Sequence, residues 1–177
     1  MKETMLMFAR YSRRADASVL SLLGGLSNEA REENRKSYYG SLSGLAVHLL
    51  EGMTYFHGLF RASLGDRPEK LAFLEPGRKV SIPKPPLSVS QWAQVSTDFA
   101  VVDGATVAFV ESLAEKDFSI PIKLDWYGGK PGAVPLHIML DHLLVHGIHH
   151  RGQISQILDE LGVEHDFSGL ELELLPL

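Results

Sequence analysis

The sequence contains no cysteine among its 177 residues. Disulfide bridges, cysteine-based zinc sites and a thiol nucleophile supplied by the protein are therefore excluded, and no oxidising compartment is required. The sequence also has no apolar run near the ~18 residues that a bilayer span needs. Its first twenty residues hold only short apolar runs broken by charged side chains, so they lack the apolar core of a signal peptide. We expect a soluble, cytoplasmic protein with no membrane partner.

Concentrated positive charge is missing as well. Lys and Arg number 17 against 22 Asp and Glu, the net charge is −5, and the basic residues are scattered along the chain. Binding to nucleic acid needs a basic patch that neutralises phosphates, so no nucleic acid is expected as a partner. Hydrophobic residues make up 45% and charged residues 22%, which is typical of globular proteins. The length suits a single domain that spans residues 1–177.

Apolar residues recur at three- and four-residue steps in four long segments, the spacing that places them on one face of a helix. The expected helices run over 4–23, from about Ser41 to Gly65, from a cap at Ser88 or Ser90 to about Glu115, and from beyond Pro135 to Gly162. The polar segment between the first two helices, SNEAREENRKSYYGS, is interpreted as a connection.

Two further connections separate the later helices. Residues 66–87 contain five prolines, which exclude a continuous helix, and a loop of this length is often functional. Residues 118–124 alternate apolar and polar before Gly128 and Gly129, which predicts a short strand or hairpin. The expected fold class is all-α, an up-down four-helix bundle with a long crossover loop and a short hairpin-like insertion.

The most distinctive stretch is HLLVHGIHHRGQ, residues 142–153, which holds four of the chain's eight histidines. Helix residues four apart share a face with Cβ atoms about 5–6 Å apart, so two such imidazoles can chelate one metal ion. This geometry permits three ligand pairs, namely His142 with His146, His146 with His150, and His146 with His149. The alternative is that these are ordinary hydrogen-bonded helix residues.

His48 strengthens the case for metal binding. It lies on an otherwise apolar stripe of the expected second helix, GLAVHLLEG, where an unpartnered imidazole would be destabilising. A third imidazole from this helix would complete a three-nitrogen site with open positions, the arrangement of a reactive metal. Neutral ligands leave a divalent ion its full charge, which makes it a good Lewis acid. Imidazole suits zinc, nickel, iron and copper, so the donors alone do not select the metal.

Two segments, VHGIHHRGQIS at 145–155 and VHLLEGMTYF at 47–56, resemble the DinB-like family of four-helix-bundle metalloproteins. The resemblance covers nearly the whole chain in helix order and length. It implies that the metal ligands are His48, His146 and His150. It also implies a homodimer and a divalent metal ion, with nickel or zinc favoured and iron or manganese as alternatives.

Family members with an assigned activity are similar to thiol S-transferases and isomerases that use low-molecular-weight thiols such as bacillithiol or mycothiol. The resemblance therefore implies a metal-dependent thiol S-transferase or hydrolase, in which the ion activates a bound thiol or water against a small electrophilic substrate. The alternative is a non-enzymatic metal-binding sensor, store or interaction module. That alternative predicts that a side chain such as His57 or His142 closes the fourth ligand position.

Several residues are candidates for the surroundings of this site. Glu51, one turn after the histidine of the second helix, is either an acid-base carboxylate or a solvated surface residue. Arg151 either binds an anion or forms an ion pair, and Gln153 is expected to make structural hydrogen bonds. Ser12 and Asp16 stand where the family usually has amides, so the resemblance is weakest on the substrate side of the pocket.

The aromatic residues divide into two groups. Tyr38 and Tyr39, together with the loop 66–87, are candidate borders of the pocket, and the sequence does not rank them. Trp92 and Trp126 are expected to be core or dimer residues rather than residues that stack on a substrate.

Overall fold

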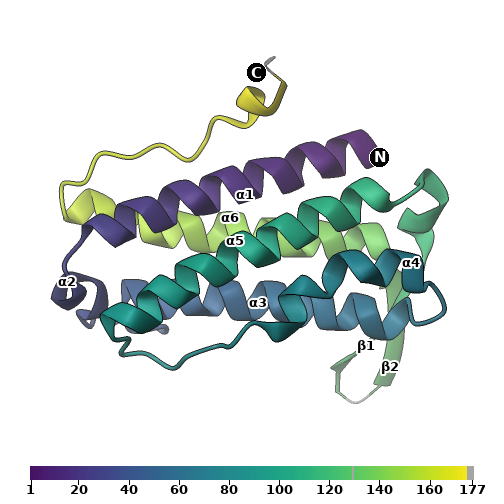
Figure 1. The fold of residues 1–177 in the computed structure, drawn as a ribbon, viewed down its shortest axis with the longest axis horizontal. Helices are drawn as coiled ribbons and strands as arrows, with labels where there is room; N and C mark the ends of the chain where they lie inside the picture. Colours follow the sequence, from purple (N-terminus) through teal and green to yellow (C-terminus); the bar gives the residue numbers. More distant parts are fainter. Residues whose placement is uncertain (129, 175–177) are drawn as a thin grey trace.

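The protein is an all-α bundle in a computed structural model that describes residues 1–128 and 130–174. Its long helices are α1 (Lys2–Gly25), α3 (Leu42–Ser63), α5 (Val89–Ser112) and α6 (Leu136–Glu160). Both α1 and α3 pack against α5 and α6, so the helices form a four-membered ring around the core (Figure 1). The predicted all-α fold class and the four predicted helices are confirmed.

The crossover after α3 sets the direction of the next helix. It contains α4 (Pro68–Leu71) and the 3-10 turns η1 (Ala72–Leu74) and η2 (Pro76–Lys79), in place of the continuous helix that the prolines exclude. The chain then returns along the bundle before α5 begins, so α5 runs in the same direction as α3 (Figure 1). Without this return, α5 would run antiparallel to α3.

Serine side chains begin two of the long helices. Ser41 accepts a hydrogen bond from the Gly44 backbone N–H at the start of α3. At the start of α5, the N-cap is Ser88 rather than Ser90, and its partner Gln91 completes a capping box. The short α2 (Asn28–Glu32) occupies the polar connection between α1 and α3.

The end of α5 lies at Ser112, three residues before the expected Glu115. The carboxylate of Asp117 accepts a hydrogen bond from the Ala114 backbone N–H at 2.8 Å. The chain therefore leaves the α-helix and continues as the 3-10 turn η3 (Glu115–Ser119). The apolar spacing predicted a longer helix because it gives no sign of this contact: Asp117 lies beyond the last residue of the periodic run.

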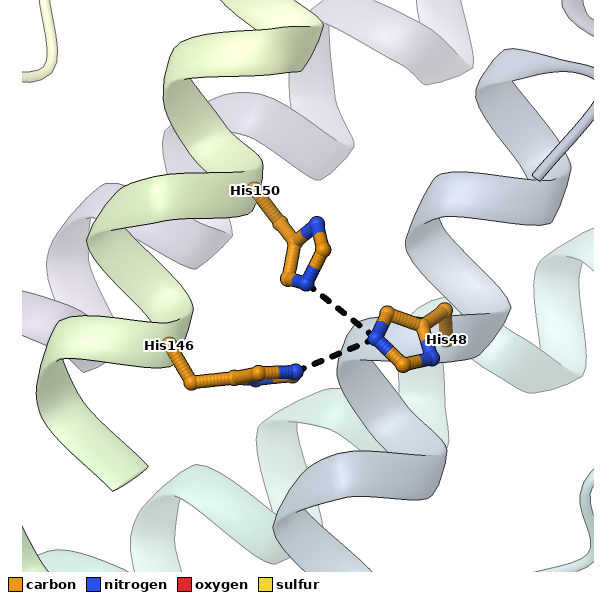
Figure 2. A group of neighbouring side chains, drawn as sticks. All are labelled: His48, His146 and His150. Carbon is orange, nitrogen blue, oxygen red and sulfur yellow. Dashed lines mark hydrogen bonds between the residues drawn. The ribbon is translucent and has the colours of Figure 1, made fainter. Parts of the chain in front are cut away.

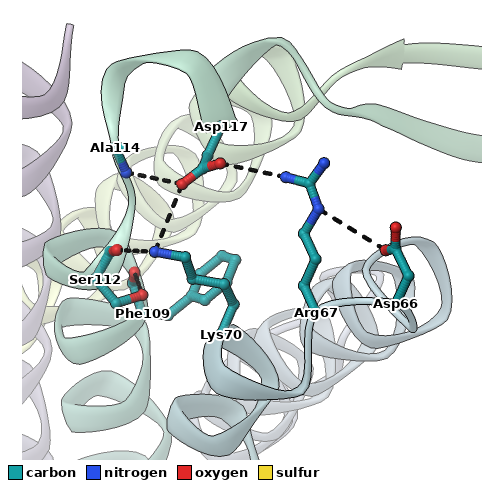
Figure 3. Close-up of polar contacts among 7 residues, drawn as sticks. All are labelled: Asp66, Arg67, Lys70, Phe109, Ser112, Ala114 and Asp117. Atoms are coloured by element: carbon teal, nitrogen blue, oxygen red, sulfur yellow. Dashed lines mark hydrogen bonds and ion pairs between the residues drawn. The ribbon is translucent and has the colours of Figure 1, made fainter.

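Asp117 also fixes the crossover to the end of α5 (Figure 3). Its buried carboxylate lies 3.2 Å from Arg67 Nη1 and 3.5 Å from Lys70 Nζ, and the Lys70 ammonium also donates to the Ser112 carbonyl. Each polar group of this cluster has a partner of opposite character, as buried polar groups require. The cluster is therefore a structural tie between α4 and α5.

A hairpin joins η3 to α6, as predicted. β1 (Pro121–Tyr127) pairs antiparallel with β2 (Lys130–Pro135), and Gly128 has a φ of 64° in the turn, a left-handed conformation that favours glycine. Gly129, which the turn prediction also included, lies outside the described residues. The chain ends its described part in the 3-10 turn η4 (Leu170–Leu174).

The two tryptophans differ in burial. Trp92 of α5 is a core residue, as expected, and the Arg31 guanidinium lies 4.9 Å from its ring centroid. Trp126 of β1 is 36% exposed and donates its indole N–H to the Tyr55 hydroxyl at 2.6 Å. The core contains side chains from all four long helices, and among its largest members Phe60, Phe99, Phe109 and Phe118 are fully buried. Within residues 1–128 and 130–174, no helix has both the length and the apolar character to cross a membrane.

Candidate metal centre

Three histidines from two helices meet inside the bundle (Figure 2). His48 projects from α3, and His146 and His150 project from consecutive turns of α6. The Nε2 atom of His48 lies 3.1 Å from the Nε2 atom of each of the other two. One ligand nitrogen from each ring falls within 4.8 Å of the others, so the three residues form a group that can hold a metal ion.

The arrangement follows from helix packing and from one glycine. Because α3 packs against α6, His48 faces the turn that separates His146 from His150. The His146 ring lies against Gly52 of α3, where an added Cβ would be 2.7 Å from its Cε1 atom. No side chain other than hydrogen fits that contact, so Gly52 makes room for the imidazole.

The hydrogen bonds around the cluster determine where its protons lie. The Nδ1 atom of His150 is 2.7 Å from Gln153 Oε1, which can only accept, so Nδ1 carries the hydrogen and Nε2 presents a lone pair. The Nε2 atom of His48 has either one hydrogen or one lone pair, yet it faces two nitrogens at 3.1 Å. At most one of these contacts is a linear N–H···N bond, so at least one lone pair of the cluster has no hydrogen to accept.

The electrostatic surroundings favour neutral imidazoles. Burial lowers the pKa of His48, His146 and His150, and the neighbouring histidines lower that of His146 further, to about 4. Neutral imidazole is the form that binds metal. Two imidazole nitrogens at roughly 2.0–2.1 Å from one ion are separated by about 2.9–3.4 Å between octahedral and tetrahedral angles. The observed separations of 3.1 Å from His48 fall in that range.

The other histidines of the α6 motif lie beside this group. His142 packs its ring against Phe56 and Trp126, with centroid separations of 5.2 and 5.6 Å. His149 is exposed and meets the edge of His150 at a centroid separation of 4.8 Å. Neither belongs to the three-histidine group in the described part of the chain.

His57 is buried away from the three clustered histidines and contacts Thr106 instead. The Thr106 hydroxyl donates to the Val102 carbonyl at 3.0 Å, so it accepts from His57 Nε2 at 2.9 Å. The Nδ1 atom of His57 is buried and has no partner among the described residues. Burial, with a smaller effect from Arg61, lowers the pKa of His57 to about 4. His57 is therefore a neutral core residue.

Arg151 forms an ion pair inside the bundle. Its Nη1 atom lies 2.9 Å from Asp16 Oδ1, and both side chains are almost fully buried. Ser12 Oγ lies 3.5 Å from Nη2, and the guanidinium carbon is 5.4 Å from the Tyr11 ring centroid. Burial raises the pKa of Asp16, and Arg151 opposes that rise. Ser12 and Asp16 of α1 thus both contact the Arg151 guanidinium. Of the two alternatives for Arg151, the ion pair is the one observed.

A cleft of about 470 Å³ opens on the outer side of His48. Its lining includes Tyr39, His48, Glu51 and residues 82–85 of the crossover, and we call it the loop-side cleft. Glu51 is exposed, and its carboxylate has no hydrogen-bond or ion-pair partner among the described residues. The proline-rich crossover therefore borders the candidate site, as its length suggested.

Two residues that contact the histidine cluster, Tyr39 and Gly52, were not singled out from the sequence. Tyr39 stacks on His48 with a centroid separation of 4.0 Å and an interplanar angle of 22°, whereas its neighbour Tyr38 is 94% exposed. Burial, Tyr38 and Glu51 raise the pKa of Tyr39, so its phenol stays neutral. Gly52 lies one turn after His48 on the same face, and that spacing is the signal that sequence reasoning could have used.

Comparison with known protein families gives a match over nearly the whole chain. The sequence model of the DinB family matches residues 1–167. Searches against curated proteins and against solved structures gave no significant match.

Proposed function

The chain belongs to the DinB family, and we propose that it binds one divalent metal ion through His48, His146 and His150 and uses this ion in catalysis. One observation carries the proposal: three Nε2 atoms converge from two helices, and their hydrogens cannot satisfy all the contacts between them. A cation would accept all three lone pairs. We favour nickel or zinc, as the family resemblance implies; imidazole suits iron as well, whereas manganese prefers oxygen ligands.

We infer that the reaction is thiol S-transfer or hydrolysis. When bound, the ion would act as a Lewis acid that lowers the pKa of a thiol or a water at the site. Gln153 holds the Nδ1 hydrogen of His150 and so keeps its Nε2 lone pair directed at the site. The loop-side cleft offers a low-molecular-weight thiol and a small electrophilic substrate a path to His48. Glu51 borders this cleft, and we assign it the role of proton acceptor.

The same geometry supports an enzyme over the sensor, store or interaction module. The module predicts that His57 or His142 closes the fourth ligand position. His57 instead contacts Thr106, and the His142 ring packs against two aromatic side chains. The three-histidine group in the described residues has no fourth protein ligand, and His48 borders an open cleft. A cation with a free position beside a cleft is the arrangement of catalytic sites.

Activity of metal-stripped and metal-reloaded protein tests the proposal. Untagged protein reloaded with Ni²⁺ or Zn²⁺ is incubated with 2-mercaptoethanol and 1-chloro-2,4-dinitrobenzene for thiol transfer, or with 4-nitrophenyl acetate for hydrolysis. We expect turnover that requires the ion, is lost in His146→Ala and survives in His149→Ala. Glu51→Gln should lower the rate by about 100-fold or more while the ion is retained.

Two outcomes would contradict this function. Equal turnover by stripped and reloaded protein would remove the ion from the reaction. Stoichiometric metal without turnover in either assay would favour the non-enzymatic module.

We also propose that the protein forms the homodimer that the family resemblance implies. Sedimentation velocity on untagged protein tests this independently of activity.

A further inference from the structure

Tyr39 contacts two of the three clustered histidines. Its ring is stacked on His48 with centroids 4.0 Å apart, and it meets His150 edge-on with centroids 5.3 Å apart and an interplanar angle of 87°. One aromatic side chain thus covers the face of the α3 imidazole and the edge of an α6 imidazole. The orientation of both rings depends on where Tyr39 is held.

The backbone holds Tyr39 firmly. Gly40 adopts a φ of 76° and closes a tight turn by donating its N–H to the Ser37 carbonyl at 3.0 Å. The carbonyl of Tyr39 accepts from the Ser41 N–H at 2.9 Å. It also rests on Gly44 in the first turn of α3, where an added Cβ would be 1.9 Å from the oxygen. Gly44 precedes His48 by one helical turn, which places the Tyr39 ring over that imidazole.

Two clefts share Tyr39 as a common wall. The loop-side cleft of about 470 Å³ includes His48 in its lining. A second cleft of about 430 Å³, which we call the α6-side cleft, is lined by Tyr38, Arg35, His149 and Gln153 among others. None of the three clustered histidines is part of its lining. The α6-side cleft therefore does not reach the cluster, and Tyr39 is part of the wall that separates the two clefts.

We propose that Tyr39 is a positioning and specificity-determining residue, which fixes the plane of the His48 ring and restricts access to the metal centre to the loop-side cleft. This inference rests on the proposed function, because access matters only if an ion is held there. It follows that ligands of the ion are compact, since a branched or aryl-substituted ligand would need the space beyond Tyr39. Removal of the ring joins the two clefts and admits larger ligands.

Two ligands of different size test this role on protein loaded with Co²⁺, whose visible absorption reports ligand binding. Imidazole is the small probe and 4-phenylimidazole the bulky one, and each is titrated into wild type, Tyr39→Phe, Tyr39→Ala and Tyr38→Ala. In Tyr39→Ala, we expect the affinity for the bulky probe relative to the small one to rise about ten-fold or more, because the phenyl group gains an apolar space. The affinity for Co²⁺ should fall about ten-fold as His48 loses its support.

The matched variants separate this role from a general loosening of the turn. Tyr39→Phe keeps the ring and should match wild type in both measurements, and so should Tyr38→Ala, whose side chain is 94% exposed in the wild type. If Tyr39→Ala does not fold, Tyr39→Leu keeps an apolar side chain that packs against α3. It should show the same rise in affinity for 4-phenylimidazole relative to imidazole.

Failure of the inference and failure of the proposed function give different results. An unchanged ratio in Tyr39→Ala or Tyr39→Leu, in a wild type that takes up Co²⁺, would overturn the role of Tyr39 alone. An equal rise in Tyr38→Ala would also overturn it. A wild type that takes up no Co²⁺ would instead overturn the proposed metal centre, and the inference would fall with it.

Discussion

The imidazole of His146 lies against the backbone of Gly52, so closely that a Cβ at position 52 would be 2.7 Å from its Cε1 atom. A methyl group there forces the ring away from His48. We predict that Gly52→Ala weakens metal affinity by about 10–100-fold without removing a ligand, as the loss of a supporting contact does. Competition with a chelating dye measures the affinity.

Gly58 provides the matched control on the same helix. A Cβ added there meets nothing within 4 Å, so Gly58→Ala should leave metal affinity unchanged and stabilise the helix by up to about 1 kcal/mol. Equal metal affinity in the two variants would mean that the ring position against Gly52 has no bearing on binding.

Gln153 supports His150 through a single hydrogen bond of 2.7 Å to Nδ1. In Gln153→Ala, the imidazole is free to change tautomer and rotate, so we expect metal affinity to fall about 10–100-fold. Gln156→Ala is the control, because the Gln156 amide contacts Glu160 and touches no histidine of the cluster. Isothermal titration of stripped protein with Zn²⁺ compares them, and a loss of the same size in Gln156→Ala would speak against the role of Gln153.

The buried pair of Asp16 and Arg151 is predicted to matter for stability and not for metal binding. Asp16→Ala removes the hydrogen-bonded counter-charge of the buried guanidinium and leaves only the electrostatic attraction of the buried Asp103 carboxyl, so the free energy of unfolding should fall by up to about 3–5 kcal/mol. Glu111→Ala breaks the exposed pair with Arg10 and should cost less than about 1 kcal/mol. Urea unfolding of metal-free protein measures both changes. If both variants lost a similar amount of unfolding free energy, the buried Asp16–Arg151 pair would contribute no more to stability than the exposed pair.

His57 should make stability depend on pH. Its folded pKa of about 4 lies below the ordinary value of 6.5, so the unfolded chain takes up a proton between these values that the folded protein does not. Its contribution is therefore fully present above pH 6.5 and is lost as pH falls toward 4. The loss should approach about 3 kcal/mol.

His57→Gln tests this dependence, because the glutamine amide keeps a donor for Thr106 but does not titrate. The difference in unfolding free energy between wild type and variant should shift in favour of the variant as pH falls from 6.5 to 4. Urea unfolding of metal-free protein at several pH values measures it. A constant difference across that range would show that the buried imidazole has an ordinary pKa.

Much of the fold follows from the sequence because it depends on local signals. Helical periodicity located all four long helices, and the prolines of residues 66–87 excluded a continuous helix there. For the site, spacing alone left three histidine pairs open, and the family resemblance selected His146 and His150 with His48. The structure brings those three together, whereas their binding of a metal stays a prediction.

The rest depends on contacts between distant segments, which one sequence does not display. Arg151 and Asp16 are 135 residues apart, so the choice between anion binding and an ion pair could not be made from spacing. Tyr39 lies in a polar segment interpreted as a connection, and its contact with His48 depends on the turn at Gly40. The partner of His57 likewise comes from another helix.

The content of metal per chain tests the central claim most directly. Elemental analysis is applied to wild type, His48→Ala and His149→Ala, each purified without a histidine tag and reloaded with Ni²⁺ or Zn²⁺. We predict close to one ion per chain in wild type and in His149→Ala, and almost none in His48→Ala. A wild type without metal after reloading, or a His48→Ala variant that retains it, would contradict a metal centre built from His48, His146 and His150.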